Sequence, residues 1–273
     1  MNKKIIVILT LMMFLVMNTS AAGFLDFFNE TESSGTNNDT TLVVGLNPVF
    51  PPFVYKDDSG NNVGFDLEIA KEVCDRNNWT LKETELIDWN SKEFEVNSGE
   101  IDCIWGAFTI DGREDEYLFT EPYYNNAQVV VVKSDSNINS LSDLKGKNVE
   151  IQTGSSAISA INNNTTLKNS LNNLFEVENN NVAMMDLESG TCDAVIMDNG
   201  FANYYITNKY PSCKILSENV SDEKYGIGFK KGNAELRDAV QKTLDEMFKD
   251  GTVEKIAQNY SDYKLEQGLI KGL

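Results

Sequence analysis

The feature that most constrains the fold of this 273-residue chain is an alternation of strand-like and helix-like segments. A short apolar run at residues 42–46 is followed by an amphipathic segment that opens at Val63-Gly-Phe-Asp and reaches residue 77. A strand pattern at 81–87, a helix that closes at 94–99 and a strand at 101–105 continue the series. This order of strand, helix, strand, helix, strand predicts a parallel sheet covered by helices.

The same alternation restarts after a continuous apolar strand at residues 128–133. A second set of strands and helices follows, which predicts a second lobe of the same class. Its expected strands are 149–152, 174–177, 194–197 and 214–216, and its expected helices are 155–161, 182–189 and 201–210.

The last segments of the chain have no sheet of their own. They are a strand at 225–229 and amphipathic helices at 234–249 and 252–258. The economical arrangement returns them to the first lobe, so that two strands cross between the lobes near 128–133 and 222–228 and form a hinge. We therefore expect an α/β protein of two Rossmann-like lobes, with lobe 1 made of residues 41–130 and 225–273 and lobe 2 made of residues 131–224.

The N-terminus has the pattern of an export signal. Lys3 and Lys4 precede an apolar run from Ile5 to Met17, and small residues up to Ala22 follow that run. The run is short for a membrane-spanning helix, so residues 1–22 are predicted to be a signal peptide, with an uncleaved anchor as the alternative. The polar segment 23–40 is predicted to be a disordered linker, and the protein to be periplasmic or at the cell surface.

Composition excludes several classes of function. The formal net charge of −19 argues against nucleic acid, because phosphate binding needs clustered lysine and arginine. The four cysteines form no CxxC pattern and the chain has no histidine, so no metal site or other cofactor is expected. Two alternatives remain for the cysteines: a bridge between Cys192 and Cys213, or four buried thiols.

Three polar groups follow three predicted strands. Arg113 comes shortly after an apolar strand that ends in Phe108-Thr109, Gly154-Ser155-Ser156 follows a second strand, and Asp198 follows a third. An arginine and a helix N-terminus suit a carboxylate, whereas an aspartate suits an ammonium group. Together they suit a free α-amino acid.

Three motifs in the same order resemble the family 3 extracellular solute-binding proteins, the amino-acid receptors of ABC importers. They are GFDLEIAKEV at residue 64, SGEIDCIWGAFTIDGREDEYLFTEPYY at residue 98 and LESGTCDAVIMD at residue 187. The resemblance covers about residues 41–260 and implies the type II periplasmic-binding-protein fold, in which the ligand lies between two lobes.

The resemblance also assigns the charged contacts of the ligand. Arg113 matches the arginine that grips the ligand carboxylate, and Ser155 and Ser156 match residues that offer amide and hydroxyl groups to the same carboxylate. Asp198 matches the acid that accepts the ligand ammonium. A lone buried ammonium would be costly, so an acid is needed there.

Contacts to the ligand side chain follow in the same way. Phe50 and Trp89 match aromatic residues on opposite faces of the side chain. Asn47 matches a position that reads its distal end, and an amide there favours a polar, uncharged side chain over a cationic one.

The chain departs from the family pattern at one turn. The family usually has five steps between its ligand-binding threonine and its arginine, whereas Thr109 and Arg113 are four steps apart. Either Thr109 is the contact or Phe108 takes its place. We favour Thr109, with the carbonyl of Ala107 as a further acceptor for the ammonium. The segment after about Ser261 extends beyond the usual end of the family, and no role is assigned to it.

The expected function is an extracytoplasmic receptor that binds a polar amino acid and delivers it to the permease subunits of an ABC importer. The resemblance implies closure of the two lobes around the ligand, and the receptor is expected to be a monomer without catalytic activity. Two alternatives use the same fold: an amino-acid sensor domain and a dehydratase-like enzyme. Enzymatic chemistry needs a general acid or base at the pocket, and the absence of histidine argues against it.

Overall fold

The computed structural model describes residues 40–270. The predicted signal peptide or anchor and nearly all of the predicted linker lie outside these residues, as do residues 271–273. Within 40–270, no helix is long and apolar enough to cross a membrane. All four cysteines are buried and free, which is the second of the two alternatives.

The first lobe is built on a sheet in the order β5-β1-β6-β14-β7. The strand β1 (Thr41–Leu46) runs parallel to β5 (Thr80–Glu85) and β6 (Cys103–Ile104). Strand β14 (Gly228–Phe229) is antiparallel to β6 and to β7 (Leu118–Phe119). A small separate sheet joins β2 (Val49–Phe50), β3 (Val54–Lys56) and β4 (Asn62–Val63).

Four helices accompany these sheets: α3 (Phe65–Asn77), α4 (Lys92–Ser98), α9 (Ala234–Lys249) and α10 (Thr252–Gln258). Acids in the first turn of α3 favour its start, and Asn78 ends it in the left-handed conformation. Val240 and Leu244 of α9 pack into one buried cluster with Leu42 and Val44 of β1. The C-terminal helices therefore return to the first sheet, as predicted.

The second lobe has the sheet order β10-β9-β11-β8-β12, with β13 also paired to β8. Its strands are β8 (Tyr124–Lys133), β9 (Asn148–Gln152), β10 (Asn173–Val177), β11 (Ala194–Asp198), β12 (Cys213–Ile215) and β13 (Ser221–Tyr225). Its helices are α5 (Ser156–Asn163), α6 (Thr165–Ser170), α7 (Asn180–Ser189) and α8 (Asn199–Asn208), with a 3₁₀ turn at Leu141–Leu144. Helix α6 had no counterpart in the sequence prediction.

The central strands of this sheet are covered on both faces. Val129 and Val131 of β8 lie in one buried cluster, and Val130 and Val132 lie in another. A strand buried on both sides needs a continuous apolar run rather than alternation, which is why residues 129–132 are all valine. Two helix-covered sheets confirm the predicted α/β class.

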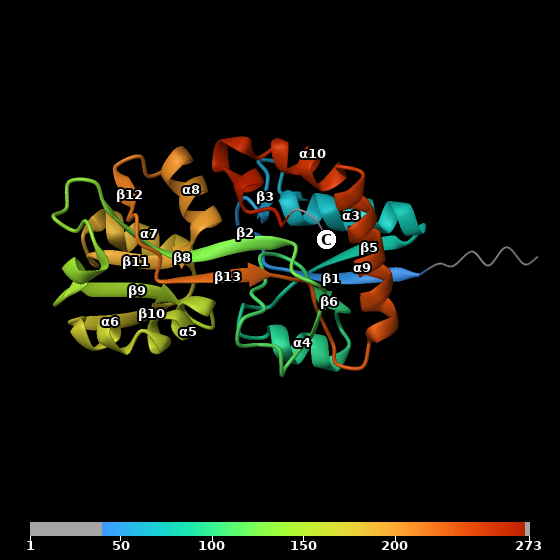
Figure 1. Cartoon of the computed structure of the whole chain (residues 1–273), viewed down its shortest axis with the longest axis horizontal. Coiled ribbons are helices and arrows are strands. Elements are labelled where there is room, and N and C mark those ends of the chain that lie inside the picture. The colour runs from blue at the N-terminus through green and yellow to red at the C-terminus, as the bar shows by residue number, and fades with distance from the viewer. Residues whose placement is uncertain (1–39, 271–273) are drawn as a thin grey trace, which may run out of the picture. The chain divides into compact units, whose positions relative to one another are not determined.

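Strands β8 and β13 run antiparallel through the middle of the described chain (Figure 1), with Tyr124 opposite Tyr225 and Gln128 opposite Ser221. The predicted strand 225–229 is wrong in one respect: it is two strands, and they belong to different sheets. The break falls at Gly226, where a Cβ atom would lie 2.8 Å from the Ile110 side chain. The part of β8 that pairs with β13 is residues 124–128, whereas the predicted crossing on this strand was residues 128–133.

The C-terminal segment packs along the start of β8. It forms the short 3₁₀ turns Ser261–Tyr263 and Leu265–Gln267, and Leu265 is fully buried. The amide N–H of Asn125 donates to the carbonyl of Gly268 at 2.6 Å. The ring of Tyr263 lies 4.8 Å from that of Tyr204 on α8. The segment that had no assigned role therefore covers the hinge and contacts both lobes.

Candidate ligand-binding site

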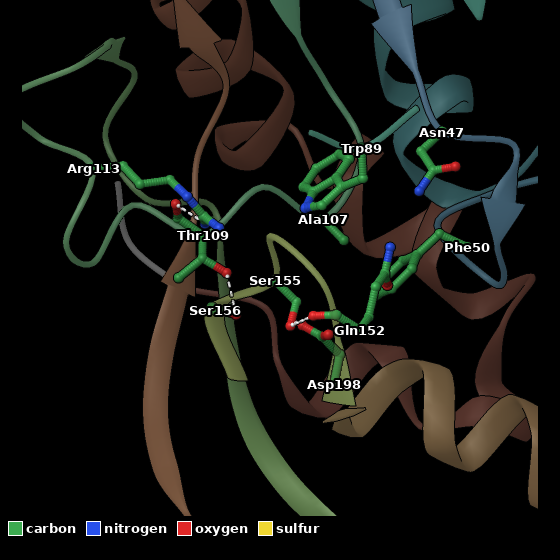
Figure 2. A pocket seen from close by; sticks show the side chains of 11 residues that line it. Asn47, Phe50, Trp89, Ala107, Thr109, Arg113, Gln152, Ser155, Ser156 and Asp198 are labelled. Carbon is green, nitrogen blue, oxygen red and sulfur yellow. Dashed lines mark hydrogen bonds between the residues drawn. The ribbon is translucent and has the colours of Figure 1, made fainter. Parts of the chain in front are cut away.

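All nine residues predicted from the sequence line one pocket between the two lobes (Figure 2). Its lining residues enclose about 350 Å³ of space, which includes solvent at the open mouth. Sequence reasoning missed two further lining residues, Gly106 and Gln152. Neither stands out in the sequence, because a glycine in a loop and a polar strand end are common. The predicted residues are Asn47, Phe50, Trp89, Ala107, Thr109, Arg113, Ser155, Ser156 and Asp198.

Arg113 is a cation held by neutral groups. Its Nη1 donates to the Thr109 carbonyl at 2.9 Å and its Nη2 to the Gly154 carbonyl at 3.4 Å. The guanidinium also lies over the Phe108 ring, 5.0 Å from its centre. Burial lowers the pKa of Arg113, while the nearby Glu223 acts in the opposite direction. Within residues 40–270 it forms no salt bridge, so its charge is available for an anion in the pocket.

Thr109 and Phe108, the two candidates at the shortened turn, have different surroundings. Thr109 lines the pocket, and its hydroxyl donates to the Ser156 hydroxyl of the other lobe at 3.3 Å. Phe108 is fully buried and packs edge-on against Tyr117 and Trp89, with ring centres at 5.0 and 5.8 Å. Thr109 is therefore the pocket residue, and Phe108 belongs to the core.

The turn before Thr109 is fixed by a buried acid that sequence reasoning did not assign to the site. Ala107 has a φ of 50°, an uncommon conformation for a residue with a side chain. Its amide N–H donates to Asp66 at 2.6 Å, and the Tyr123 hydroxyl donates to the same carboxylate at 2.9 Å. Burial raises the pKa of Asp66 to about 7, against the effect of these two bonds. The Gly-Phe-Asp motif thus holds one wall of the pocket.

The two serines lie where α5 begins. The Ser155 hydroxyl does not cap the helix; it donates to the Gln152 carbonyl at 2.7 Å. The Ser156 hydroxyl accepts from the Gln128 side chain at 3.0 Å. Amide groups of the first turn of a helix attract anions, so this end of α5 suits a carboxylate.

Asp198 lies at the end of β11, directly before α8. Its side chain does not cap α8. Instead its Oδ1 accepts from the Asn126 amide at 2.9 Å and from the Tyr225 hydroxyl at 2.6 Å. The residue is buried, and burial followed by the charge of Glu223 raises the pKa of Asp198 well above its ordinary value. The carboxylate is thus a desolvated acceptor inside the pocket.

The aromatic residues and Asn47 contribute from the first lobe. The Phe50 ring lies 5.0 Å from Phe201 of the second lobe and 6.2 Å from Phe53. Asn47 follows β1 and is partly buried. The side chains of Asn47, Trp89 and Ala107 gather in the upper part of Figure 2, opposite Gln152, Ser155 and Asp198.

The lobes meet at the carbonyl of Gly154. The Trp89 indole donates to it at 3.0 Å, and the Lys92 ammonium lies 3.5 Å away. Gly154 has a φ of 67°, and a Cβ atom there would lie 2.1 Å from the Asn90 side chain. Only a glycine at position 154 allows the Asn90 side chain to approach this closely without strain.

Burial, then the charge of Arg113, lowers the pKa of Lys92 to about 8.

Residues 42–263 match the family described as bacterial extracellular solute-binding proteins, family 3. The match spans most of the chain, and the chain belongs to this family. The fold, the pocket between the lobes and the order of the three motifs agree with that membership.

Individual relatives are similar over most of their length. The "Probable amino-acid-binding protein YxeM" of Bacillus subtilis is 31% identical over 246 residues, which cover 86% of this chain and 90% of that protein. An ancestral arginine-binding protein has been solved with arginine and separately with glutamine, and it is 36% identical to this chain. Its arginine-bound structure has a TM-score of 0.74, and the match covers 81% of this chain and 97% of that protein. A substrate-binding protein of an ABC uptake transporter from Streptococcus pneumoniae, with bound histidine, is 27% identical with a TM-score of 0.77, at 82% and 93% coverage.

Proposed function

We propose that the chain is an extracytoplasmic receptor that binds a free polar amino acid between its lobes and delivers it to the permease subunits of an ABC importer. One observation carries the proposal: a partly buried cation, a helix N-terminus and a buried carboxylate line the same small pocket. A zwitterion with a carboxylate and an ammonium on one carbon complements that arrangement.

The proposed contacts follow from the charges. Arg113 binds the ligand carboxylate from the first lobe, and Ser155, Ser156 and the amide groups of α5 bind it from the second. Asp198 accepts the ammonium, with Thr109 and the Ala107 carbonyl beside it. Because these contacts come from both lobes, the ligand favours the closed arrangement.

The ligand side chain is proposed to lie between Phe50 and Trp89, with Asn47 at its distal end. The uncharged amide of Asn47 favours a polar, uncharged side chain. Relatives solved with arginine, glutamine or histidine support an amino acid as ligand and leave its identity to experiment.

The remaining parts of the proposal concern the whole protein. The family is described as extracellular, which supports export of this chain. We further propose a monomer of two lobes, joined through β8 and β13, that returns its ligand chemically unchanged. The family and the relatives named above are binding proteins, which supports a receptor over an enzyme.

A thermal-shift screen tests the proposal. The purified protein is partially unfolded and refolded to remove copurified ligand, and is then screened against the twenty amino acids plus cystine. A ligand that binds only the folded state raises the melting temperature, by an amount equivalent to about 2.7 kcal/mol at 100 times Kd. We expect one or a few polar amino acids to raise it. A cooperative transition that none of them shifts would contradict the proposal.

A further inference from the structure

Glu223 is a buried acid outside the pocket. It lies on the hinge strand β13 and is 6% exposed. Its Oε1 accepts from the Asn126 amide at 2.7 Å and from the Gln128 amide at 2.9 Å. Within the described residues no lysine or arginine forms a salt bridge with it. A buried carboxylate without an ion-pair partner is costly, so its position calls for a function.

The two amides that bind Glu223 also bind residues of the pocket. The second hydrogen of the Asn126 amide is donated to Asp198, and the Gln128 amide also donates to Ser156. Glu223 therefore anchors the proposed ammonium acceptor and one of the proposed carboxylate contacts. Both links pass through β8, the other strand of the hinge.

The charges around Glu223 and Asp198 do not balance. Asp198 from β11 and Glu223 from β13 are two acids, and the Tyr225 hydroxyl donates to Asp198. Arg113, from the turn after Thr109, is the cation that acts on both acids. A neighbouring carboxylate disfavours ionisation of a buried acid, so Asp198 retains a proton beside Glu223. The raised pKa of Asp198, caused by burial and then by Glu223, agrees with that geometry.

We propose that Glu223 is a positioning residue for amino-acid binding: with Asp198 it forms a carboxylate pair joined by the Asn126 amide, and a ligand ammonium replaces the proton that Asp198 retains. This inference rests on the proposed function. The exchange conserves charge, since one ammonium enters the pocket and one proton leaves for solvent. It favours ligands whose amine is protonated, and it makes binding release about one proton near neutral pH.

The first test needs no ligand. Carboxyl ¹³C resonances of aspartate-labelled protein are followed against pH, with Asp198→Asn to assign the signal. In the ligand-free protein Asp198 is expected to titrate well above its ordinary value. In Glu223→Gln, whose side-chain carbonyl keeps both amide bonds, that titration is expected to move down towards the ordinary value. Glu150→Gln is the matched control, because Glu150 is a buried acid of the same lobe outside the pocket.

The second test is titration calorimetry with the amino acid found in the screen, in buffers of different ionisation enthalpy. The unaltered protein is expected to release about one proton per ligand, so that its affinity rises about tenfold per pH unit below the Asp198 titration. Burial, the larger cause of the raised pKa of Asp198, remains in Glu223→Gln, so this variant is expected to release less than one proton per ligand near neutral pH, and its rise in affinity should end at a lower pH. Glu150→Gln should behave like the unaltered protein. Glu223→Ala, which removes both amide bonds, is expected to lose affinity at every pH.

The outcomes separate the two proposals. Binding without proton release, together with an ordinary Asp198 titration, overturns the carboxylate pair and leaves the receptor function standing. A raised Asp198 titration that Glu223→Gln does not lower also overturns it. A raised titration that Glu223→Gln lowers, in a protein that binds no amino acid, overturns the receptor function and the ligand exchange with it.

Discussion

The two walls of the pocket are built in different ways. The wall from the first lobe consists of aromatic rings and one cation, Phe50, Trp89 and Arg113, held by packing and by backbone carbonyls. The wall from the second lobe consists of hydroxyls and an acid, and its Ser156 and Asp198 are held by side chains of the hinge strands. The second wall thus depends on the hinge strands, whereas the first is held by backbone carbonyls of both lobes and by packing that includes contact of Phe50 with Phe201.

This difference suggests that the two lobes recognise different parts of the ligand. The first lobe alone presents a cation and an apolar face, which suit the carboxylate and the side chain of an amino acid. In the proposed site, recognition of the ammonium requires Asp198, and so requires the second lobe to close.

Arg113→Ala is expected to weaken amino-acid binding about 100-fold or more. Removing one partner of a buried, hydrogen-bonded charge pair costs about 2–5 kcal/mol. The melting temperature of the ligand-free protein should change little, since Arg113 forms no salt bridge within the described chain. Calorimetry measures the affinity, and Arg237→Ala is the control arginine outside the pocket. Unchanged affinity in Arg113→Ala would refute the role of the first wall.

Asp198→Asn is expected to change the dependence of ligand-free stability on pH. The folded-state pKa of Asp198 is raised above its unfolded value of about 3.9. The folded chain therefore retains a proton that the unfolded chain loses, and stability falls as pH rises from about 4 through the raised pKa. Asparagine keeps the hydrogen bonds to Asn126 and Tyr225 and removes the part of the loss of stability with rising pH that Asp198 causes.

Urea midpoints at pH 5, 6.5 and 8 measure that effect. Part of the decline should remain in the variant, because the pKa of Asp66 is also raised, to about 7. An identical decline in both proteins would show that Asp198 is not desolvated as described.

Trp89→Phe is expected to weaken binding about 2- to 10-fold. The substitution keeps an aromatic wall but removes the indole bond to the Gly154 carbonyl, and one hydrogen bond contributes about 0.5–1.5 kcal/mol. Because that bond joins the lobes, the loss should fall mainly on closure. Trp79→Phe is the control, since Trp79 packs on the first core outside the pocket. Equal affinities for the two variants would argue against the contact.

Asn47→Asp is expected to have the smallest effect, a shift in preference of a few-fold towards cationic side chains. A partly buried carboxylate at the distal end of the pocket attracts a positive charge, though water screens much of that attraction. Competition between glutamine and arginine measures the shift. A preference that stays constant would place Asn47 away from the ligand side chain.

Much of the fold follows from the sequence, because strands buried on both faces and amphipathic helices leave regular patterns. Residues 129–132 and 234–249 are examples, and both elements were predicted. The break at Gly226 was not, since Tyr-Gly-Ile-Gly-Phe alternates like a single strand. Only the approach of Ile110 and the pairing of each half with a different sheet divide it.

The pocket shows the same limit. Motif spacing placed Arg113, Ser155 and Asp198 together, and they line one pocket. The residues that hold them in place, such as Asp66 and Glu223, are ordinary acids in the sequence. Their burial and their partners come from segments far away in the chain, and no local pattern records such contacts.

The most direct test of the account is calorimetry of the unaltered protein with the amino acid found in the screen and with two analogues. One analogue lacks the amino group, and the other lacks the carboxylate. If Arg113 from the first wall and Asp198 from the second grip the two ends of one zwitterion, each analogue should bind at least about 100-fold more weakly. An analogue that retains the affinity of the amino acid within a few-fold would contradict the two-wall account.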